Sequence, residues 1–156
     1  RDYSAEGKIV LSRKEKFYYD IMVEKAIFEF TKGRLVSCKS NNENFEGILL
    51  NKPNKMNRIG EIALVSEDSP LAQLEDFYNS LLLDENSGCH FALGYYISEC
   101  ANIDKEKIDK NGPRYYHYNT SLYHTDLVFG NESITVEAET KDKKKILIMD
   151  QGRWQI

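Results

Sequence analysis

The apolar positions of the chain recur mostly in short alternating runs, which predicts a fold with more strands than helices. Residues 27–30 and 34–36 flank Lys32-Gly33. A glycine in a tight turn supplies the positive φ that a short loop needs, so we expect a hairpin. Residues 59–65 form an apolar run broken only by Glu61. This run predicts a central strand covered on both faces, with Glu61 on the same side as Ala63.

Apolar residues spaced by three and four predict three helices. One covers residues 45–49, behind Asn41 and Asn42 as candidate caps, and ends before Pro53. A second begins at Ser69-Pro70 and continues to Leu82. A third runs from about Cys89 to Cys100 and places His90 in its first turn. These helices are expected to cover a sheet.

The C-terminal third is expected to be an antiparallel meander. A polar stretch at 102–119 predicts a loop or lid, and three strands follow at 121–129, 133–140 and 144–150. The predicted fold class is α+β, with a mixed, mostly antiparallel sheet covered by two or three helices. All 156 residues are expected to form a single domain.

Composition narrows the function classes. The net charge is -4, and acidic and basic residues are intermingled, which disfavours a nucleic-acid surface. No run approaches the roughly 20 apolar residues of a membrane span. Three cysteines without Cys-x-x-Cys spacing disfavour a disulfide framework and fit a reducing cytoplasm. The first residues, from Arg1, look like the middle of a segment, so we expect a domain of a longer polypeptide.

Carboxylates and imidazoles in apolar segments are the candidate metal-binding groups. In the strand predicted at 121–129, His124 and Asp126 point the same way, about 6 to 7 Å apart along the strand. The two side chains can converge on a cation. Alternatively, His124 forms a hydrogen bond with a neighbour and Asp126 caps a turn. His90 is either a hydrogen-bonded core histidine or a ligand. Glu61 is either a ligand or half of a buried ion pair.

Several short motifs follow one another along the chain in a definite order. They are Tyr3-Ser4-Ala5-Glu6-Gly7, Gly60-Glu61-Ile62-Ala63-Leu64-Val65, Asp68-Ser69-Pro70, Phe77-Tyr78-Asn79, Asp84-Glu85-Asn86, Cys89-His90, Ala92-Leu93-Gly94, His124-x-Asp126 and Gly152-Arg153-Trp154. In this order they resemble the thermophilic-metalloprotease family of aminopeptidases (the aminopeptidase T, AmpS and PepS type). The resemblance covers most of the chain, and its specificity comes from the order of the motifs.

The resemblance implies a dinuclear metal site that removes N-terminal residues from short peptides. Glu61 would be a metal ligand and catalytic residue, with His90, His124 and Asp126 as further ligands. The cofactors would be two divalent ions, and spacing cannot choose among zinc, cobalt and manganese. The whole enzyme would be a cytoplasmic homodimer, in which this chain is the C-terminal metal-carrying part and a further N-terminal domain of the same polypeptide completes it.

Three departures from the family pattern matter. The family's first metal-binding glutamate falls before Arg1, so we expect a complete two-metal site to need residues outside this chain. A family tyrosine falls at Ile97, which makes Tyr96 the candidate substitute as a catalytic residue. The stretch 71–75 differs from the family's and looks one residue shorter, so substrate preference is not carried over.

Two alternatives remain open at this point. Asp126 followed by Glu139 and Lys141 resembles the carboxylates and lysine of metal-dependent nucleases, which would need Glu139 beside Asp126. The chain would otherwise be a non-catalytic structural or dimerisation domain, because the missing glutamate would leave cations weakly held. Geometry separates the first alternative from the peptidase hypothesis, and metal affinity separates the second.

Overall fold

A computed structural model describes most of the chain. The described residues are 4–11, 14–17, 21–51, 56–73, 78, 80–100, 118–119, 121–130 and 133–156. The predicted loop at 102–119 lies almost wholly outside them. Within the described part, no helix has both the length and the apolar character needed to cross a membrane.

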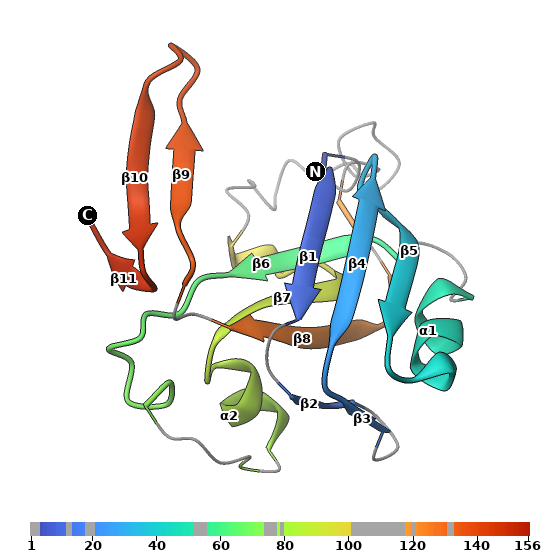
Figure 1. Cartoon of the computed structure of the whole chain (residues 1–156). Coiled ribbons are helices and arrows are strands. Elements are labelled where there is room, and N and C mark those ends of the chain that lie inside the picture. Colours follow the sequence, from blue (N-terminus) through green and yellow to red (C-terminus); the bar gives the residue numbers. More distant parts are fainter. Residues whose placement is uncertain are drawn as a thin grey trace. The chain divides into compact units, whose positions relative to one another are not determined.

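Antiparallel strands dominate the described residues, and the helices are short, consistent with an α+β protein (Figure 1). Instead of one sheet there are four small ones, with strand orders β1-β4-β5, β2-β3, β6-β7-β8 and β11-β10-β9. The elements are β1 (Gly7–Leu11), β2 (Glu15–Phe17), β3 (Ile21–Val23), β4 (Ala26–Thr31), β5 (Arg34–Ser40), α1 (Glu43–Leu50), β6 (Ile59–Ala63), α2 (Leu81–Glu85), β7 (Cys89–Gly94), the 3-10 turn η2 (Ser98–Cys100), β8 (His124–Gly130), β9 (Val136–Glu139), β10 (Lys145–Asp150) and β11 (Arg153–Trp154).

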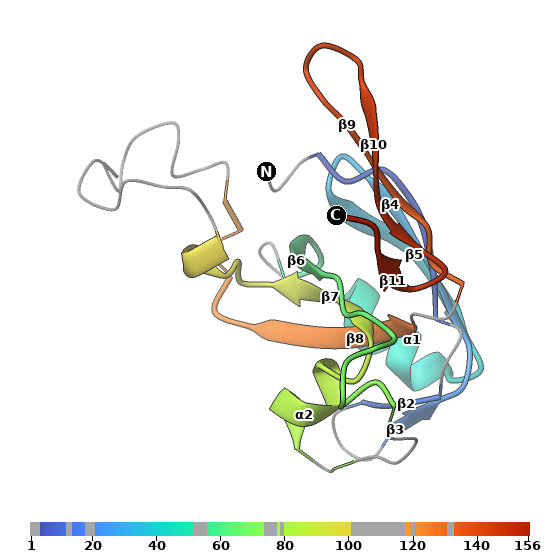
Figure 2. The ribbon, with the colours of Figure 1, turned by 90° about the vertical axis from the view of Figure 1, so that its left-hand side faces the viewer.

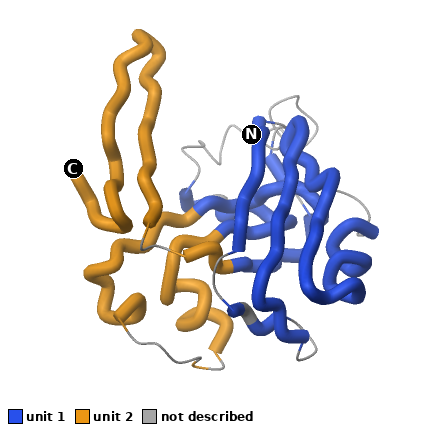
Figure 3. The backbone as a smooth tube through the Cα atoms, viewed as in Figure 1, with its two compact units in different colours: residues 1–62, 91–127 blue, residues 63–90, 128–156 orange. Residues whose placement is uncertain are grey.

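The chain forms two compact units (Figure 3). The first contains residues 1–62 and 91–127, and the second contains residues 63–90 and 128–156. Each unit is built from two stretches that are distant in the sequence. That the whole chain behaves as a single domain stays a prediction.

The first unit contains the predicted hairpin, which is confirmed. β4 pairs with β5 from Ala26↔Ser40 to Thr31↔Arg34, and β1 pairs with the other edge of β4. The two loop residues, Lys32 and Gly33, have φ values of 50° and 73°, as a type I′ turn requires. The helix predicted behind Asn41 and Asn42 is also confirmed as α1. Asn42 is its cap, because the Asn42 side chain accepts a hydrogen bond from the Phe45 N–H at 3.2 Å.

Phenylalanines make the core of the first unit. The Phe28 ring meets Phe45 at 6.1 Å and Phe91 at 5.1 Å between ring centroids, both edge to face. Phe17 and Phe30 extend the cluster against Phe45 and Phe91 respectively. Such pairs add about 0.5–1.5 kcal/mol each beyond their burial. They join the N-terminal strands to β7 within this unit.

The sheet β6-β7-β8 corrects two predictions. Residues 89–94 are the middle strand β7 and not the first half of a helix, so His90 lies on a strand. All six residues are buried, and such a short apolar run does not distinguish a strand from a buried helix by its period. β6 is an edge strand of this sheet and not a central one, and Ile62 on it is 55 % exposed.

The long helix predicted from Ser69 to Leu82 is wrong. Residues 67–73 form turns, and helix α2 begins only at Leu81. The Asp84 carboxylate explains the break, because it accepts hydrogen bonds from the N–H groups of Tyr78 at 2.7 Å and Ser80 at 3.0 Å. A side-chain acceptor that takes backbone donors in this way competes with the helical ladder.

The C-terminal meander is confirmed only for its last strands. β9 and β10 form an antiparallel ribbon in both views (Figures 1 and 2), and β11 pairs with β10. The turn between β10 and β11, at Gln151-Gly152, has φ values of 45° and 72°. β8, expected to be the first strand of the meander, belongs instead to the sheet with β7.

Candidate metal centre

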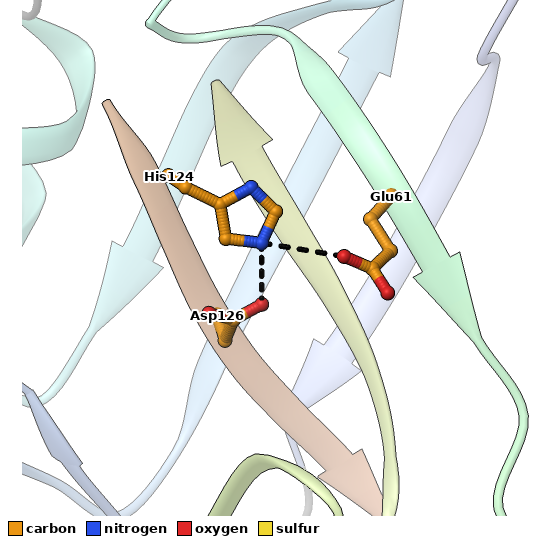
Figure 4. A group of neighbouring side chains, drawn as sticks. All are labelled: Glu61, His124 and Asp126. Carbon is orange, nitrogen blue, oxygen red and sulfur yellow. Dashed lines mark hydrogen bonds and ion pairs between the residues drawn. The ribbon is translucent and has the colours of Figure 1, made fainter. Parts of the chain in front are cut away.

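Two edge strands of one sheet bring three candidate ligands together. Glu61 lies on β6, and His124 and Asp126 lie on β8, with β7 between the two strands. His124 Nε2 is 3.0 Å from Asp126 Oδ1 and 3.3 Å from Glu61 Oε2 (Figure 4). One ligand atom from each residue lies within 4.8 Å of the others. The three side chains thus converge over β7.

Strand periodicity explains why His124 and Asp126 share a face. The residues between and after them, Thr125 and Leu127, are buried at 3 % and 0 % exposure. His124 and Asp126 therefore turn to the opposite side, where their side chains remain 26 % and 19 % exposed. A cation can reach such partly covered groups from solvent, and the low exposure strengthens their electrostatic interactions.

The two carboxylates change the protonation of the imidazole. The hydrogen bond with Asp126 is the main cause that raises the pKa of His124 to about 9. The Tyr95 carbonyl and the charges of Asp126 and Glu61 act in the same direction, and burial opposes them. The raised pKa favours the imidazolium, with a proton on each ring nitrogen, at neutral pH in the metal-free chain. A bound cation has to displace one of these two protons.

The donor set fits a divalent metal ion. One imidazole nitrogen and two carboxylates are ligands that suit zinc, cobalt or manganese. Without a cation, the same carboxylates are held together by the imidazolium of His124, as the raised pKa indicates. The imidazolium and a bound cation would thus each compensate the negative charges of the two carboxylates at this position.

A cavity of about 660 Å³ adjoins Glu61 within the first unit. Tyr96 lines it, and its ring stacks on that of Tyr118 with 5.1 Å between centroids. Ile97 also lines the cavity, so both residues considered for the family tyrosine border it. The remaining lining is mainly apolar and includes Ile9, Phe30, Ile59 and Ile62. The cavity has the size for a small organic group beside a charged site.

The other proposed ligand, His90, falls in the second unit. It is 3 % exposed, and its Nδ1 lies 3.0 Å from the Gly88 carbonyl oxygen. A hydrogen bond of this kind is the usual way in which a metal-binding histidine has its other nitrogen oriented. Its role as a ligand stays a prediction.

The nuclease alternative stays a hypothesis, because Asp126 lies in the first unit and Glu139 in the second. Among the described residues, the candidate metal group consists of Glu61, His124 and Asp126. Glu139 instead pairs with Lys143 at 2.7 Å in the β9–β10 hairpin.

Comparison with known proteins decides the family. The family described as thermophilic metalloprotease (M29) matches residues 1–154. The chain belongs to this family. Aminopeptidase 2 of Geobacillus stearothermophilus is 34 % identical over 110 residues, which are 68 % of the chain and 25 % of that protein. Aminopeptidase AmpS of Bacillus subtilis is 28 % identical over 151 residues, which are 94 % of the chain and 36 % of the relative.

A solved structure supports the same assignment to the thermophilic metalloproteases. Wild-type AmpT from Thermus thermophilus has a TM-score of 0.81 and 29 % identity, covering 99 % of the chain and 38 % of AmpT. The chain thus spans between a quarter and two fifths of the relatives' own lengths. Family membership and this fold are shown, and the family's name implies that its members use a metal.

One contact of the site leaves no signal in the amino-acid sequence. His124 Nδ1 lies 2.7 Å from the backbone carbonyl oxygen of Tyr95. Because every residue has a carbonyl, the identity of residue 95 carries no signal for this contact. Only the path of the backbone after β7 reveals it.

Proposed function

We propose that this chain carries the metal site of an aminopeptidase that removes N-terminal residues from short peptides with two divalent ions. The convergence of Glu61, His124 and Asp126 in a member of a metalloprotease family is the observation that supports it. These three residues would hold the ions, and His90 is proposed as a fourth ligand from the family resemblance.

The bound ions would polarise the scissile carbonyl and lower the pKa of a water molecule. The carboxylates of Glu61 and Asp126 favour binding of a cation and of the positively charged amino terminus of a peptide. Glu61 is also a candidate general base, because a carboxylate can hold a cation with one oxygen and a proton with the other. The Tyr96 hydroxyl would donate a hydrogen bond to the substrate from the wall of the cavity.

The whole enzyme would be a longer polypeptide that contains this chain. The two relatives from Geobacillus stearothermophilus and Bacillus subtilis are named aminopeptidases, and the chain covers only part of each. We extend the proposal to a longer polypeptide that supplies the first metal-binding glutamate and an N-terminal domain, and that acts as a cytoplasmic homodimer. These features rest on the family resemblance.

Metal titration of the purified chain tests the proposal most directly. We expect zinc or cobalt to bind by isothermal titration calorimetry, and Asp126→Asn to weaken binding more than about 100-fold, beyond the loss typical of a residue outside the ligand shell. Asn keeps the size of the side chain and removes its charge. Glu139→Gln is the matched control, because this carboxylate belongs to an exposed ion pair with Lys143.

The outcomes separate the hypotheses. Binding that is lost in Asp126→Asn and kept in Glu139→Gln supports a site at Glu61, His124 and Asp126. Equal losses in both variants would contradict this location. If the unaltered chain binds neither metal, a non-catalytic structural or dimerisation role becomes the better hypothesis for it.

A further inference from the structure

The orientation of His124 depends on a backbone group. A carbonyl oxygen only accepts hydrogen bonds, so the 2.7 Å contact with Tyr95 requires His124 Nδ1 to carry a proton, with or without a metal ion. Nε2 is then the nitrogen that faces Asp126 and Glu61. The Tyr95 carbonyl thus selects which nitrogen of His124 is directed to the candidate metal position.

The Tyr95 carbonyl is placed by a bend at the end of β7. Gly94 has a φ of 107°, a conformation that side chains strongly disfavour, and its N–H donates to the Arg58 carbonyl at 2.8 Å. The Tyr95 N–H donates to the Tyr123 carbonyl at 2.5 Å. Backbone contacts on both sides therefore hold the bend between β6 and the start of β8.

Gly60 leaves the space that the bend occupies. A Cβ built on Gly60 would lie 2.4 Å from the Tyr95 carbonyl oxygen and 2.5 Å from that of Gly94. Both obstacles are backbone atoms, which cannot swing aside as the end of a flexible side chain can. Gly60 has no positive φ, so its requirement for glycine is steric and comes from the carbonyl groups of Tyr95 and Gly94.

We propose that Gly60 is a positioning residue of the metal site: the absence of a side chain lets the Tyr95 carbonyl hold His124 with Nε2 toward Glu61 and Asp126. Gly60 directly precedes Glu61 on β6, so one residue influences both sides of the site. The inference rests on the proposed metal function. The absence of a side chain at Gly60 explains how the edge strand β6 can approach the end of β7 so closely.

Gly60→Ala tests the proposal, with Gly47→Ala as the matched control. A Cβ at Gly47 in α1 would meet only the Asn51 side chain, at 4.0 Å. We expect Gly60→Ala to weaken zinc binding by about 10- to 100-fold, the usual effect of losing a group that orients a metal-binding histidine. Gly47→Ala should bind zinc like the unaltered chain. Circular dichroism and thermal unfolding show whether each variant is folded.

The protonated nitrogen of His124 gives a readout that a general loss of stability does not change. In the zinc-loaded chain labelled with nitrogen-15, NMR distinguishes the metal-bound nitrogen from the one that carries hydrogen. We expect Nε2 to bind zinc and Nδ1 to carry a slowly exchanging proton, which exchanges faster in Gly60→Ala. This measurement on the unaltered chain tests the proposal even if Gly60→Ala does not fold, because zinc on Nδ1 would overturn it.

The possible results are distinct. Unaltered zinc affinity and proton exchange in a folded Gly60→Ala variant would refute the positioning role and leave the proposed function intact. An equal loss of affinity in Gly47→Ala would also refute it, since that residue is remote from the Tyr95 carbonyl. Absence of zinc binding by the unaltered chain would instead overturn the proposed function, and with it this inference.

Discussion

Two groups of charged side chains in this protein look similar in the sequence and differ in the structure. His124 lies beside Glu61 and Asp126, and all three side chains are no more than 26 % exposed. In the β9–β10 hairpin, Lys143 pairs with Glu139 and Lys145 pairs with Glu137, with every side chain at least 50 % exposed. In the first group the hydrogen bond with Asp126 and the nearby charges raise the pKa of His124, although burial opposes this rise.

The difference concerns what each group can do. Exposed pairs contribute about 0–1 kcal/mol, because water and salt screen them and their long side chains lose entropy. Two carboxylates that converge in a partly covered site repel one another unless a cation or an imidazolium lies between them. Convergence under partial burial is therefore the property that separates a candidate metal site from an ordinary surface.

Removing a ligand gives the largest expected effect. We expect Glu61→Ala, His90→Ala and Asp126→Ala each to abolish peptidase activity of the full-length enzyme, because each removes a proposed metal ligand. Release of an N-terminal residue from a short peptide measures this activity. Wild-type turnover in any of the three would refute the role of that residue, and Glu137→Ala in the exposed hairpin serves as control.

Two cysteines, Cys38 and Cys100, show the same difference between a buried and an exposed side chain. Burial, together with the charge of Glu46, raises the pKa of Cys38 to about 12, and Cys100 is exposed. At pH 8 the thiolate fraction of Cys38 is about 1000-fold below that of an ordinary thiol. We expect a thiol reagent to label Cys100 first, read by mass spectrometry. Cys38 should react at a similar rate only in urea, and fast labelling of Cys38 in the folded chain would contradict its burial.

Tyr96 tests the cavity beside the candidate site. Tyr96→Phe keeps the ring that stacks on Tyr118 and removes the hydroxyl. If that hydroxyl stabilises the reacting carbonyl, kcat of the full-length enzyme should fall about 100-fold with little change in KM. Tyr118→Phe is the control, since Tyr118 lines the same cavity without a proposed catalytic role. Unchanged kcat in Tyr96→Phe would remove Tyr96 from the catalytic residues.

The exposed hairpin should give the smallest effect. Glu139→Gln breaks the pair with Lys143, and we expect the free energy of unfolding to change by less than about 0.5 kcal/mol. Urea denaturation measures this change, and 0.5 M salt should reduce it further by screening. A loss of several kcal/mol would mean that the two charged groups are more alike than their exposure indicates.

Local patterns predicted the elements whose determinants are local. The β4–β5 hairpin was predicted from Gly33, and α1 from the candidate caps Asn41 and Asn42, because a turn glycine and a capping side chain act on their own neighbours. The helix expected after Ser69 failed because Asp84, fifteen residues later, takes the N–H groups of Tyr78 and Ser80. The strand β7 was not predicted, because a short apolar run forms a strand only when neighbouring strands pair with it.

The sequence by itself determined that His124 and Asp126 share one face, since side chains on a strand alternate with a period of two. The order of its motifs also determined the family. Only the tertiary structure decided that Glu61 meets these residues across β7 and that the Tyr95 carbonyl orients His124. Local periodicity sets the direction of a side chain, whereas long-range strand pairing and the space left by Gly60 set what that side chain meets.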